Sequence, residues 1–366
     1  MNISTNREQL LGPLQKVSGV VERRQTLPIL ANVLINASEN QLAITATDLE
    51  VEMRTVGNCQ AQSEIDFTLP ARKLLDICKA LPEGAEITME VDGERAVLKS
   101  GRRRYALGVL PAQDYPSIED SAGDTVFDVA EGTLKRLLEK TLFAMAQQDV
   151  RYYLNGLLLE ARDHCLRTVA TDGHRLAMNE EAVNIPDGKE LSIILPRKAV
   201  LELQRMLNDS DDNCRVEVST NHIRFNIGDS VFTSKLIDGR FPDYERVIPA
   251  KSQSVLKADR ETLRQALSRA SILSNEKYRG IRFQLSDGLL HLVANNPEQE
   301  EAEEDVEVEY SGGEVTIGFN VGYLLDVLNV IDTGSVTFSL SDPNSSCLIQ
   351  NDPPDAGHYV IMPMRL

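Results

Sequence analysis

The chain has 366 residues, of which 42% are hydrophobic, and a formal net charge of −18 at pH 7. It is too long for one ordinary hydrophobic core, and its composition excludes collagen-like, coiled-coil and disordered chains. Its first residues lack a basic segment followed by an apolar run, and no apolar stretch approaches the roughly 20 residues that span a bilayer, so we expect a cytoplasmic protein.

The cysteine pattern predicts core residues rather than a disulfide framework or a metal site. The five cysteines form no CxxC pair, and the closest two are 19 positions apart. An odd number at this spacing suits a reducing compartment. We therefore expect no metal and no cofactor. The five are Cys59, Cys78, Cys165, Cys214 and Cys347.

An internal repeat is the first structural prediction. A Leu and an Ala four residues apart recur twice at an offset of 124 residues, each time after a polar turn. A fixed offset that is met twice indicates a threefold repeat. We predict three domains at residues 1–124, 125–250 and 251–366. The matching pairs are Leu42 and Ala46, Leu166 and Ala170, and Leu290 and Ala294.

Each repeat reads as helix, strands, helix, strands. Leucines at helical spacing predict a first helix per repeat, and a Leu followed by an acidic residue marks a second. Short alternating segments predict strands, including a hairpin with strands at 152–159 and 166–170. The order predicts an α+β fold with antiparallel sheets and the helices on one face. The first helices are expected at 5–24, 132–151 and 257–279, and the second at 71–80, 196–207 and 320–331.

The charges are unevenly distributed. The six predicted helical segments hold 20 Lys and Arg against 10 Asp and Glu, whereas the rest of the chain holds 18 against 46. If all helices share one side of the sheets, that side attracts a phosphate backbone without reading bases. The alternative is that basic residues simply solvate helix surfaces.

Two charged stretches are complementary. Residues 101–107 are predicted to form a basic strand in the first repeat, and residues 298–309 contain eight acidic residues out of twelve in the third. Both could be solvated faces, but unlike patches on one chain can join head to tail and close a ring. We predict a homodimer whose interface includes Lys73, Arg102, Arg104, Tyr105, Leu107, Ile272, Leu273, Glu298, Glu301 and Glu304, with Ile272 and Leu273 as its apolar centre.

Motifs for enzyme chemistry are scarce. The only Gly-Lys pair is followed by Glu190, so there is no P-loop, and GxGxxG, HExxH and GxSxG are also missing. Asp172 and His174 could form an acid and base pair, which keeps a hydrolase or nucleotidyl-processing enzyme as a competing hypothesis. The matching positions of the other repeats supply no nucleophile or metal ligand, so we expect no catalytic residues. A scaffold ring without DNA is a third hypothesis.

Six segments resemble the bacterial sliding clamp family, the beta subunit of DNA polymerase III. They are TLPIL at 26–30, QDVRYYLNG at 148–156, VATDGHRL at 169–176, DGRFPDY at 238–244, ANNPEQE at 294–300 and VIMPMRL at 360–366. The resemblance implies a ring of two subunits with six similar domains, whose helices line a hole for duplex DNA. It also implies a non-catalytic processivity factor that tethers the replicative polymerase, the clamp loader and other partners through one peptide cleft.

The resemblance implies two sets of site residues. The DNA contacts would be Arg24, Arg72, Gln148, Tyr152 and Tyr153, with Lys198 as a further contact. Without the resemblance, Tyr152 and Tyr153 read as strand core, and Gln25 stands where the family often has Pro. The cleft would be formed by Leu154, Thr171, Gly173, His174, Arg175, Leu176, Pro242, Arg246, Val247, Asn320, Tyr323, Ser346, Val360, Met362, Pro363, Met364 and Arg365.

Two features of the sequence bear on this cleft. Only the second repeat continues Thr-Asp with Gly-His-Arg-Leu, so we expect the function beyond DNA encirclement to lie there. Flexible methionines suit a site that accepts several peptides. The alternative for the C-terminus is a last core strand with Val360, Met362, Met364 and Leu366 pointing inward.

Overall fold

The structure is a computed structural model that describes residues 2–21, 27–118, 123–186, 190–249, 254–340 and 342–365. Six α-helices and antiparallel strands occur in these ranges, which confirms the α+β class. None of the helices in this described part is long and apolar enough to cross a membrane.

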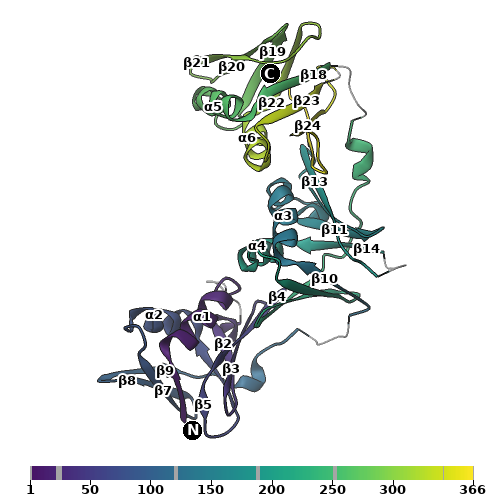
Figure 1. Cartoon of the computed structure of the whole chain (residues 1–366). Coiled ribbons are helices and arrows are strands. Elements are labelled where there is room, and N and C mark those ends of the chain that lie inside the picture. Colours follow the sequence, from purple (N-terminus) through teal and green to yellow (C-terminus); the bar gives the residue numbers. More distant parts are fainter. Residues whose placement is uncertain are drawn as a thin grey trace. The chain divides into compact units, whose positions relative to one another are not determined.

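The same order of elements occurs three times along the chain (Figure 1). The first copy comprises β1 (Asn2–Asn6), α1 (Arg7–Val17), β2 (Asn32–Ala37), β3 (Gln41–Thr47), β4 (Val51–Asn58), β6 (Ile65–Pro70), α2 (Ala71–Ala80), β7 (Glu86–Asp92), β8 (Arg95–Ser100) and β9 (Arg103–Gly108), with a short extra β5 (Gln60–Ala61). The second comprises β10 (Thr125–Ala130), α3 (Glu131–Thr141), β11 (Gly156–Arg162), β12 (Cys165–Thr171), β13 (Arg175–Ala182), β14 (Leu191–Pro196), α4 (Arg197–Met206), β15 (Asn213–Val218), β16 (His222–Ile227) and β17 (Ser230–Lys235). The third comprises β18 (Ser254–Asp259), α5 (Arg260–Ala270), β19 (Gly280–Ser286), β20 (Leu289–Asn295), β21 (Glu301–Glu307), β22 (Val315–Asn320), α6 (Val321–Val330), β23 (Ser335–Leu340), β24 (Cys347–Asp352) and β25 (His358–Ile361).

Burial confirms the repeat at the positions that predicted it. The three leucines of the repeated pairs are fully buried on β3, β12 and β20, and the three alanines are at most 1% exposed. The second helix of each copy ends alike, with a buried residue at Leu81, Leu207 or Ile331 whose amide donates back to the last turn. Equivalent residues therefore perform equivalent packing in all three copies.

The first helix of each copy is shorter than predicted, whereas the second helices match within one residue. Hydroxyl side chains stand at the ends of the first helices and bond to their backbones. Ser18 donates to the carbonyl of Gln15 at 2.8 Å, Thr141 to Leu137 at 2.9 Å and Ser271 to Ser268 at 2.8 Å. Such bonds compete with continued helix, which a pattern of leucines does not register.

The sheets join consecutive copies. One eight-stranded sheet has the order β10-β15-β16-β17-β4-β3-β2-β6, and the other β14-β11-β12-β13-β25-β24-β23-β18. The joining pairs are β4 with β17 and β13 with β25, both antiparallel. The chain correspondingly forms two compact units, residues 1–134 with 198–236 and residues 135–197 with 237–366, each of which contains one joined sheet.

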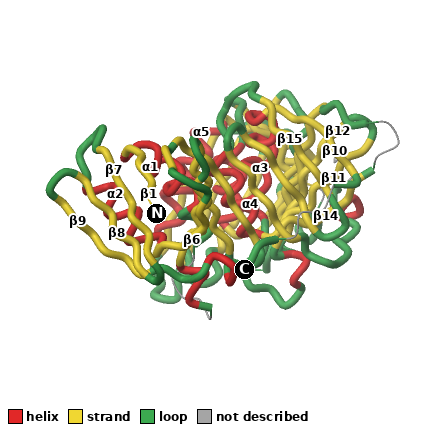
Figure 2. The backbone as a smooth tube through the Cα atoms, turned by 90° about the horizontal axis from the view of Figure 1, so that it is seen from below, coloured by secondary structure: helices red, strands yellow, loops and turns green. Residues whose placement is uncertain are grey.

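Two strands whose equivalents in the other copies form the joins lie at sheet ends instead. β9 ends the five-stranded sheet β5-β1-β7-β8-β9, and β21 ends the four-stranded sheet β21-β20-β19-β22, counted over the described strands. Figure 2 shows β7, β8 and β9 side by side, with β9 outermost. β21 is the third copy's equivalent of β4 and β13, and β9 is the first copy's equivalent of β17 and β25.

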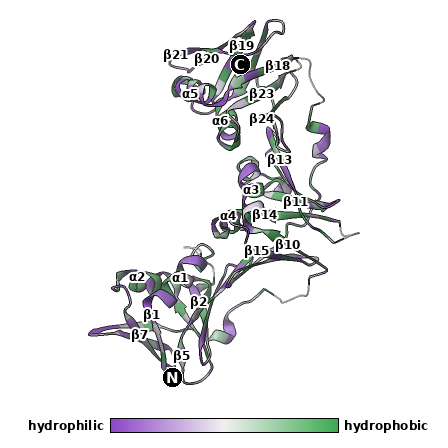
Figure 3. Ribbon diagram, viewed as in Figure 1, coloured by the Kyte–Doolittle hydropathy of each residue, from purple (hydrophilic) through white to green (hydrophobic). Residues whose placement is uncertain are grey.

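Two pairs of helices lie side by side, one pair in each unit. α1 lies beside α2, and α5 beside α6 (Figure 1). Figure 3 shows a hydrophilic and a hydrophobic side on α5, whose buried residues include Leu263 and Leu267. The six observed helices carry 14 basic and 7 acidic residues, so the excess of positive charge predicted for the longer segments persists.

Four of the five cysteines are buried, as their spacing predicted, and Cys165 is half-buried. Burial raises the pKa of Cys78 to about 11 and that of Cys214 to about 12, so both thiols stay protonated. They act as small core residues.

Candidate functional site

A slot of about 160 Å³ opens on the unit formed by residues 135–197 and 237–366. Most of its lining is apolar. The lining residues are Arg151, Leu154, Thr171, Gly173, Arg175, Leu176, Pro242, Tyr244, Val247, Val360 and Met362. Nine of these eleven belong to the cleft set that the family resemblance implies, and Arg151 and Tyr244 are additional.

The floor of the slot is a row of residues across joined strands. Thr171 on β12 is paired with Leu176 on β13, and Leu176 with Val360 on β25. Because side chains alternate along strands, these three share the face opposite to Thr168, whose hydroxyl donates to the carbonyl of Leu137 in α3. The slot therefore lies on the side of the sheet away from the helices, at the join between the second and third copies.

A tight turn connects β12 to β13 and shapes one end of the slot. The Asp172 carboxylate accepts the amides of His174 at 2.9 Å and Arg175 at 3.0 Å, and Thr171 donates to the carbonyl of Arg175 at 2.7 Å. Gly173 adopts a φ of 86°, and a Cβ there would stand 3.0 Å from the Arg151 guanidinium. Glycine is required at this point for both reasons.

The first copy builds the same turn without a histidine. The Asp48 carboxylate accepts the amides of Glu50 at 2.9 Å and Val51 at 2.8 Å, and Thr47 donates to the carbonyl of Val51. The repeated Thr-Asp pair thus has a structural role. In the second copy the other Asp172 oxygen accepts Nε of Arg175 at 3.1 Å. Asp172 therefore has a structural role, and among the described residues its side chain bonds to the amide of His174 and not to the imidazole ring.

Arg175 links the turn to the third copy. Its guanidinium forms ion pairs with Asp172 and with Asp326 of α6, and it donates to the carbonyl of Phe143 at 2.6 Å. The same group stacks 4.4 Å above the ring of Tyr323 and 5.4 Å from that of Phe143. Only 12% of the Arg175 side chain is exposed. Arg175 therefore stabilises the slot, and its charge is largely occupied by these contacts.

The loop before β11 supplies Arg151, which the sequence did not single out. Asn155 fixes this loop by accepting the Asp149 amide at 2.9 Å and donating to the Asp149 carbonyl at 2.8 Å. Arg151 then donates to both oxygens of Asp149 and to the carbonyl of Asp172 at 3.2 Å. These hydrogen bonds from Arg151 lower the pKa of Asp149 to about 2, so the pair is ionised at neutral pH.

The linker after β17 supplies the wall opposite. It forms a 3-10 helix at Tyr244–Val247 over the apolar face of the sheet, where the Tyr244 ring packs against Phe241. The sequence held a signal for Tyr244, because Asp114 and Tyr115 precede the second copy as Asp243 and Tyr244 precede the third. Tyr115 is likewise buried, with its hydroxyl donating to backbone carbonyls of the first copy.

The other expected cleft residues lie around the slot. His174 and Arg365 are exposed, and the side chain of Arg246 is 84% exposed and pairs with Asp243 at 2.6 Å. Asn320 caps α6 by accepting the amide of Gly322 at 2.9 Å, and its amide group donates to the carbonyl of the exposed Tyr278. Half-buried positions are Tyr323, Ser346, Pro363 and Met364.

The C-terminal segment differs from the predicted core strand. β25 ends at Ile361, and Met362 is 36% exposed although Val360 is buried. After Ile361 the backbone remains hydrogen-bonded to the rest of the unit. The Met362 amide donates to the carbonyl of His174 at 2.9 Å, and the Met364 amide donates to the carbonyl of Gly318 at 2.8 Å. Inward alternation therefore fails after Val360. Met362 lines the slot, whereas the half-buried Met364 is not part of the lining. Leu366 lies outside the described residues.

The residues expected to contact DNA have different environments. Arg24 lies outside the described residues, Arg72 is exposed on α2, and Gln148 is exposed with a φ of 57°. Tyr152 and Tyr153 belong to a 3-10 helix, so the predicted strand at 152–159 begins only at Gly156. Tyr152 is 58% exposed, whereas Tyr153 packs on the core.

Lys198 is engaged by groups of the chain itself. Its ammonium group forms an ion pair with Asp48 and donates to the carbonyl of Val20 at 3.2 Å. The Asp48 side chain is only 5% exposed, so Lys198 neutralises a buried charge of the repeated turn.

A threefold repeat with joined sheets, basic helices and one apolar slot defines a clamp-type binding subunit. Three family models of the DNA polymerase III beta subunit match the chain: the N-terminal domain at residues 1–119, the central domain at 128–243 and the C-terminal domain at 245–365. The chain belongs to this family, the bacterial sliding clamps. It is a non-catalytic processivity subunit, and the enzyme hypothesis is wrong.

Similar proteins cover the full length of the chain. The beta sliding clamp of Pseudomonas aeruginosa is 54% identical and that of Escherichia coli strain K12 is 50% identical, each over all of both chains. The crystal structure of the DNA polymerase III subunit beta from P. aeruginosa, at 53% identity, matches with a TM-score of 0.97 and complete coverage of both chains. A P. aeruginosa clamp bound to griselimycin, also 53% identical with complete coverage of both, matches with a TM-score of 0.96.

Proposed function

We propose that two copies of the chain form a ring that encircles duplex DNA and tethers a replicative polymerase and other proteins through the slot. The full-length family match carries this proposal, because it covers the repeat, the basic helices and the slot together. The domains run over residues 1–124, 125–250 and 251–366. As a replication protein with thiols suited to a reducing compartment, the clamp works in the cytoplasm.

The sheet topology supports the head-to-tail dimer. Within the chain, β4 of the first copy pairs with β17 of the second, and the equivalent pair β13 and β25 joins the second copy to the third. The third copy's equivalent of β4 is the acidic strand β21, and the first copy's equivalent of β17 is the basic strand β9. Both lie at sheet ends. A second subunit supplies the missing partner for each, and the rotation closes after two subunits. The exposed Ile272 next to α5 is the apolar centre of this contact.

The two edges match in chemistry as well as in topology. Arg104 is exposed on β9, whereas Tyr105 and Leu107 share its more buried face, as predicted. Arg102, just before β9, and Lys73 on α2 are exposed, and Glu298 and Glu301 are exposed at the acidic end. Glu304 differs, because it is already held by Arg269 at 2.7 Å and 2.8 Å. Leu273 is half-buried.

Charge reversal at these edges is expected to separate the ring. Arg104→Glu or Glu301→Arg alone should raise the dimer dissociation constant by about tenfold or more, and the double variant should recover part of the loss. Sedimentation at several protein concentrations measures this constant. Arg95→Glu is the matched control, since Arg95 is exposed on the inner strand β8. An equal effect of Arg95→Glu would contradict the edge assignment.

DNA is held by loose electrostatic contact. Exposed cationic, amide and hydroxyl groups such as those of Arg72, Gln148 and Tyr152 suit phosphates, and together with Arg24 they contact the backbone without reading sequence. Tyr153 packs edge-on against the ring of Tyr152, with the two ring centroids 5.8 Å apart. Lys198 contributes to this surface mainly by neutralising Asp48 in the turn of the first copy. This arrangement permits sliding, which tight base readout would stop.

Topological retention tests the function directly. Once loaded, the clamp should remain on circular DNA and be released when the circle is cut.

Arg72→Ala should weaken binding to primed DNA at low salt by about threefold or more and reduce the salt dependence of this binding. Arg162→Ala, an equal charge change on the sheet face away from the helices, is the control. Equal losses for both variants, or retention on linear DNA without end blocks, would reject the proposal.

The slot receives peptide segments of the polymerase, the clamp loader and other partners. Its apolar floor offers burial area, and the methionines adapt to different side chains. We also propose that the slot binds griselimycin, which is bound by a clamp at 53% identity. The scaffold ring without DNA is disfavoured, because the helices keep their excess of basic residues.

A further inference from the structure

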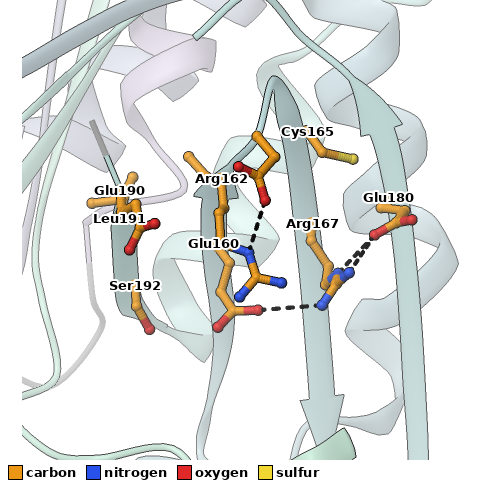
Figure 4. Close-up of a pocket in the computed structure, with 10 residues that line it drawn as sticks. Glu160, Arg162, Cys165, Arg167, Glu180, Glu190, Leu191 and Ser192 are labelled. Carbon is orange, nitrogen blue, oxygen red and sulfur yellow. Dashed lines mark hydrogen bonds and ion pairs between the residues drawn. The ribbon is translucent and has the colours of Figure 1, made fainter. Parts of the chain in front are cut away.

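A second hollow of about 400 Å³ opens on the same sheet face, beyond the slot floor (Figure 4). Three parallel rows cross the strands β11, β12 and β13 on this face. The first contains Thr171 and Leu176 of the slot, the second is the apolar row Leu158, Val169 and Met178, and the third is the charged row Glu160, Arg167 and Glu180. The charged row lines the hollow.

Arg167 is the centre of the charged row. Its Nε donates to Glu180 at 2.8 Å and its Nη1 lies 3.9 Å from Glu160, and Figure 4 shows it between these two carboxylates. The same Nη1 donates to the hydroxyl of Tyr244 at 2.7 Å and to Glu245 at 3.4 Å. Arg167 therefore contacts the linker at two consecutive residues while it is anchored to the sheet.

Tyr244 connects the two hollows. Its ring lines the slot, while its hydroxyl accepts from Arg167 and donates to Glu160 on the far side. Burial, followed by the hydrogen bond to Glu160, raises the pKa of Tyr244 to about 12, so the hydroxyl keeps its proton. The 3-10 helix that begins at Tyr244 also carries Val247, another lining residue.

We propose that Arg167 is a positioning residue for the slot. It acts through Tyr244 and Glu245 to clamp the linker against the sheet, which keeps Pro242, Tyr244 and Val247 at the spacing that a peptide requires. Arg167 itself is absent from the slot lining. The inference rests on the proposed peptide-binding function of the slot and extends it to a residue outside that slot.

The test measures griselimycin affinity by titration calorimetry on the full-length protein. Arg167→Met keeps the aliphatic stem without the charge, and Tyr244→Phe removes only the hydroxyl. Each should weaken binding by about fivefold, because a hydrogen bond to a charged group is lost. The double variant should lose no more than the worse single variant, since both interrupt one linkage. Arg162→Met, whose side chain is 58% exposed at the same hollow, should bind like the unchanged protein.

Amide hydrogen exchange separates positioning from general destabilisation. Exchange should accelerate at residues 243–248 in both single variants while residues 166–170 keep their protection. Additive losses in the double variant, equal acceleration in the sheet, or an equal loss with Arg162→Met would overturn the inference. So would unchanged affinity in Tyr244→Phe.

The failure of the proposed function has a different signature. Removal of residues 362–366 deletes Met362 from the slot. If that truncated protein binds griselimycin normally, the slot is not the site. If it loses binding while Arg167→Met and Tyr244→Phe both bind normally, the slot stands and the role of Arg167 is wrong.

Discussion

Deleting residues 362–366 should abolish detectable binding of partner peptides, a loss of about 100-fold or more. The deletion removes Met362 from the slot wall and Met364 beside it, together with the amides that donate to His174 at 2.9 Å and to Gly318 at 2.8 Å. Central apolar anchors dominate interfaces of this kind, and truncating one of them commonly costs about 2 kcal/mol or more. Fluorescence anisotropy with a labelled peptide from the clamp-binding segment of the polymerase measures the affinity.

The fold should survive this deletion. β25 ends at Ile361, so its pairing with β13 and β24 stays intact, and β9 and β21, the proposed dimer edges, lie on other sheets. The shorter deletion of 365–366 keeps both methionines and their backbone bonds, and it should lose less than about tenfold. Dimerisation and loading on circular DNA serve as controls. Normal peptide affinity after removal of 362–366 would contradict the slot assignment.

Replacing Arg175 with Ala should produce the largest stability loss of any single cleft variant, about 2 to 3 kcal/mol. The substitution leaves the Asp172 carboxylate, which is 15% exposed, without its cation, and it also removes the ion pair with Asp326. The stacking contacts with Phe143 and Tyr323 disappear with the guanidinium. Thermal unfolding should show a lower midpoint, and peptide affinity should fall because the turn before β13 loosens.

Arg246→Ala is the matched control for stability. Arg246 belongs to the same expected cleft set, but its side chain is 84% exposed and pairs only at the surface with Asp243. Exposed ion pairs contribute about 0 to 1 kcal/mol, so its unfolding midpoint should barely move. Equal midpoints for the two variants would show that Arg175 does not hold the turn to α6.

The sequence was informative wherever a local pattern recurred. The threefold repeat, the second helices, the basic strand at 103–108 and the cores around Leu42, Leu166 and Leu290 could all be predicted, because each depends on spacing within one copy. Helix ends were less predictable. Ser18, Thr141 and Ser271 bond to the backbone at the ends of the first helices, and such bonds, which compete with further helix, are not reported by leucine periodicity.

The slot was predictable only in part. The family motifs pointed to nine lining residues, which include Leu154, Pro242 and Val247 outside the strands. Arg151 and Tyr244 were missed, because their places depend on contacts with Asp149 and Arg167 that the motifs do not record. Strand pairing also decided that Lys198 neutralises Asp48, which lies 150 residues away in sequence. No local pattern records such partners.

By itself, the sequence determined that three equivalent copies exist, that their helices together carry an excess of basic residues and that one copy carries a distinctive turn. Only the tertiary structure decided that Arg167 reaches Tyr244, 77 residues away, and that β21 and β9 remain at sheet ends. The reason is physical. Periodicity is set by neighbours along the chain, whereas charge pairing and edge exposure depend on which strand of the next copy completes each sheet.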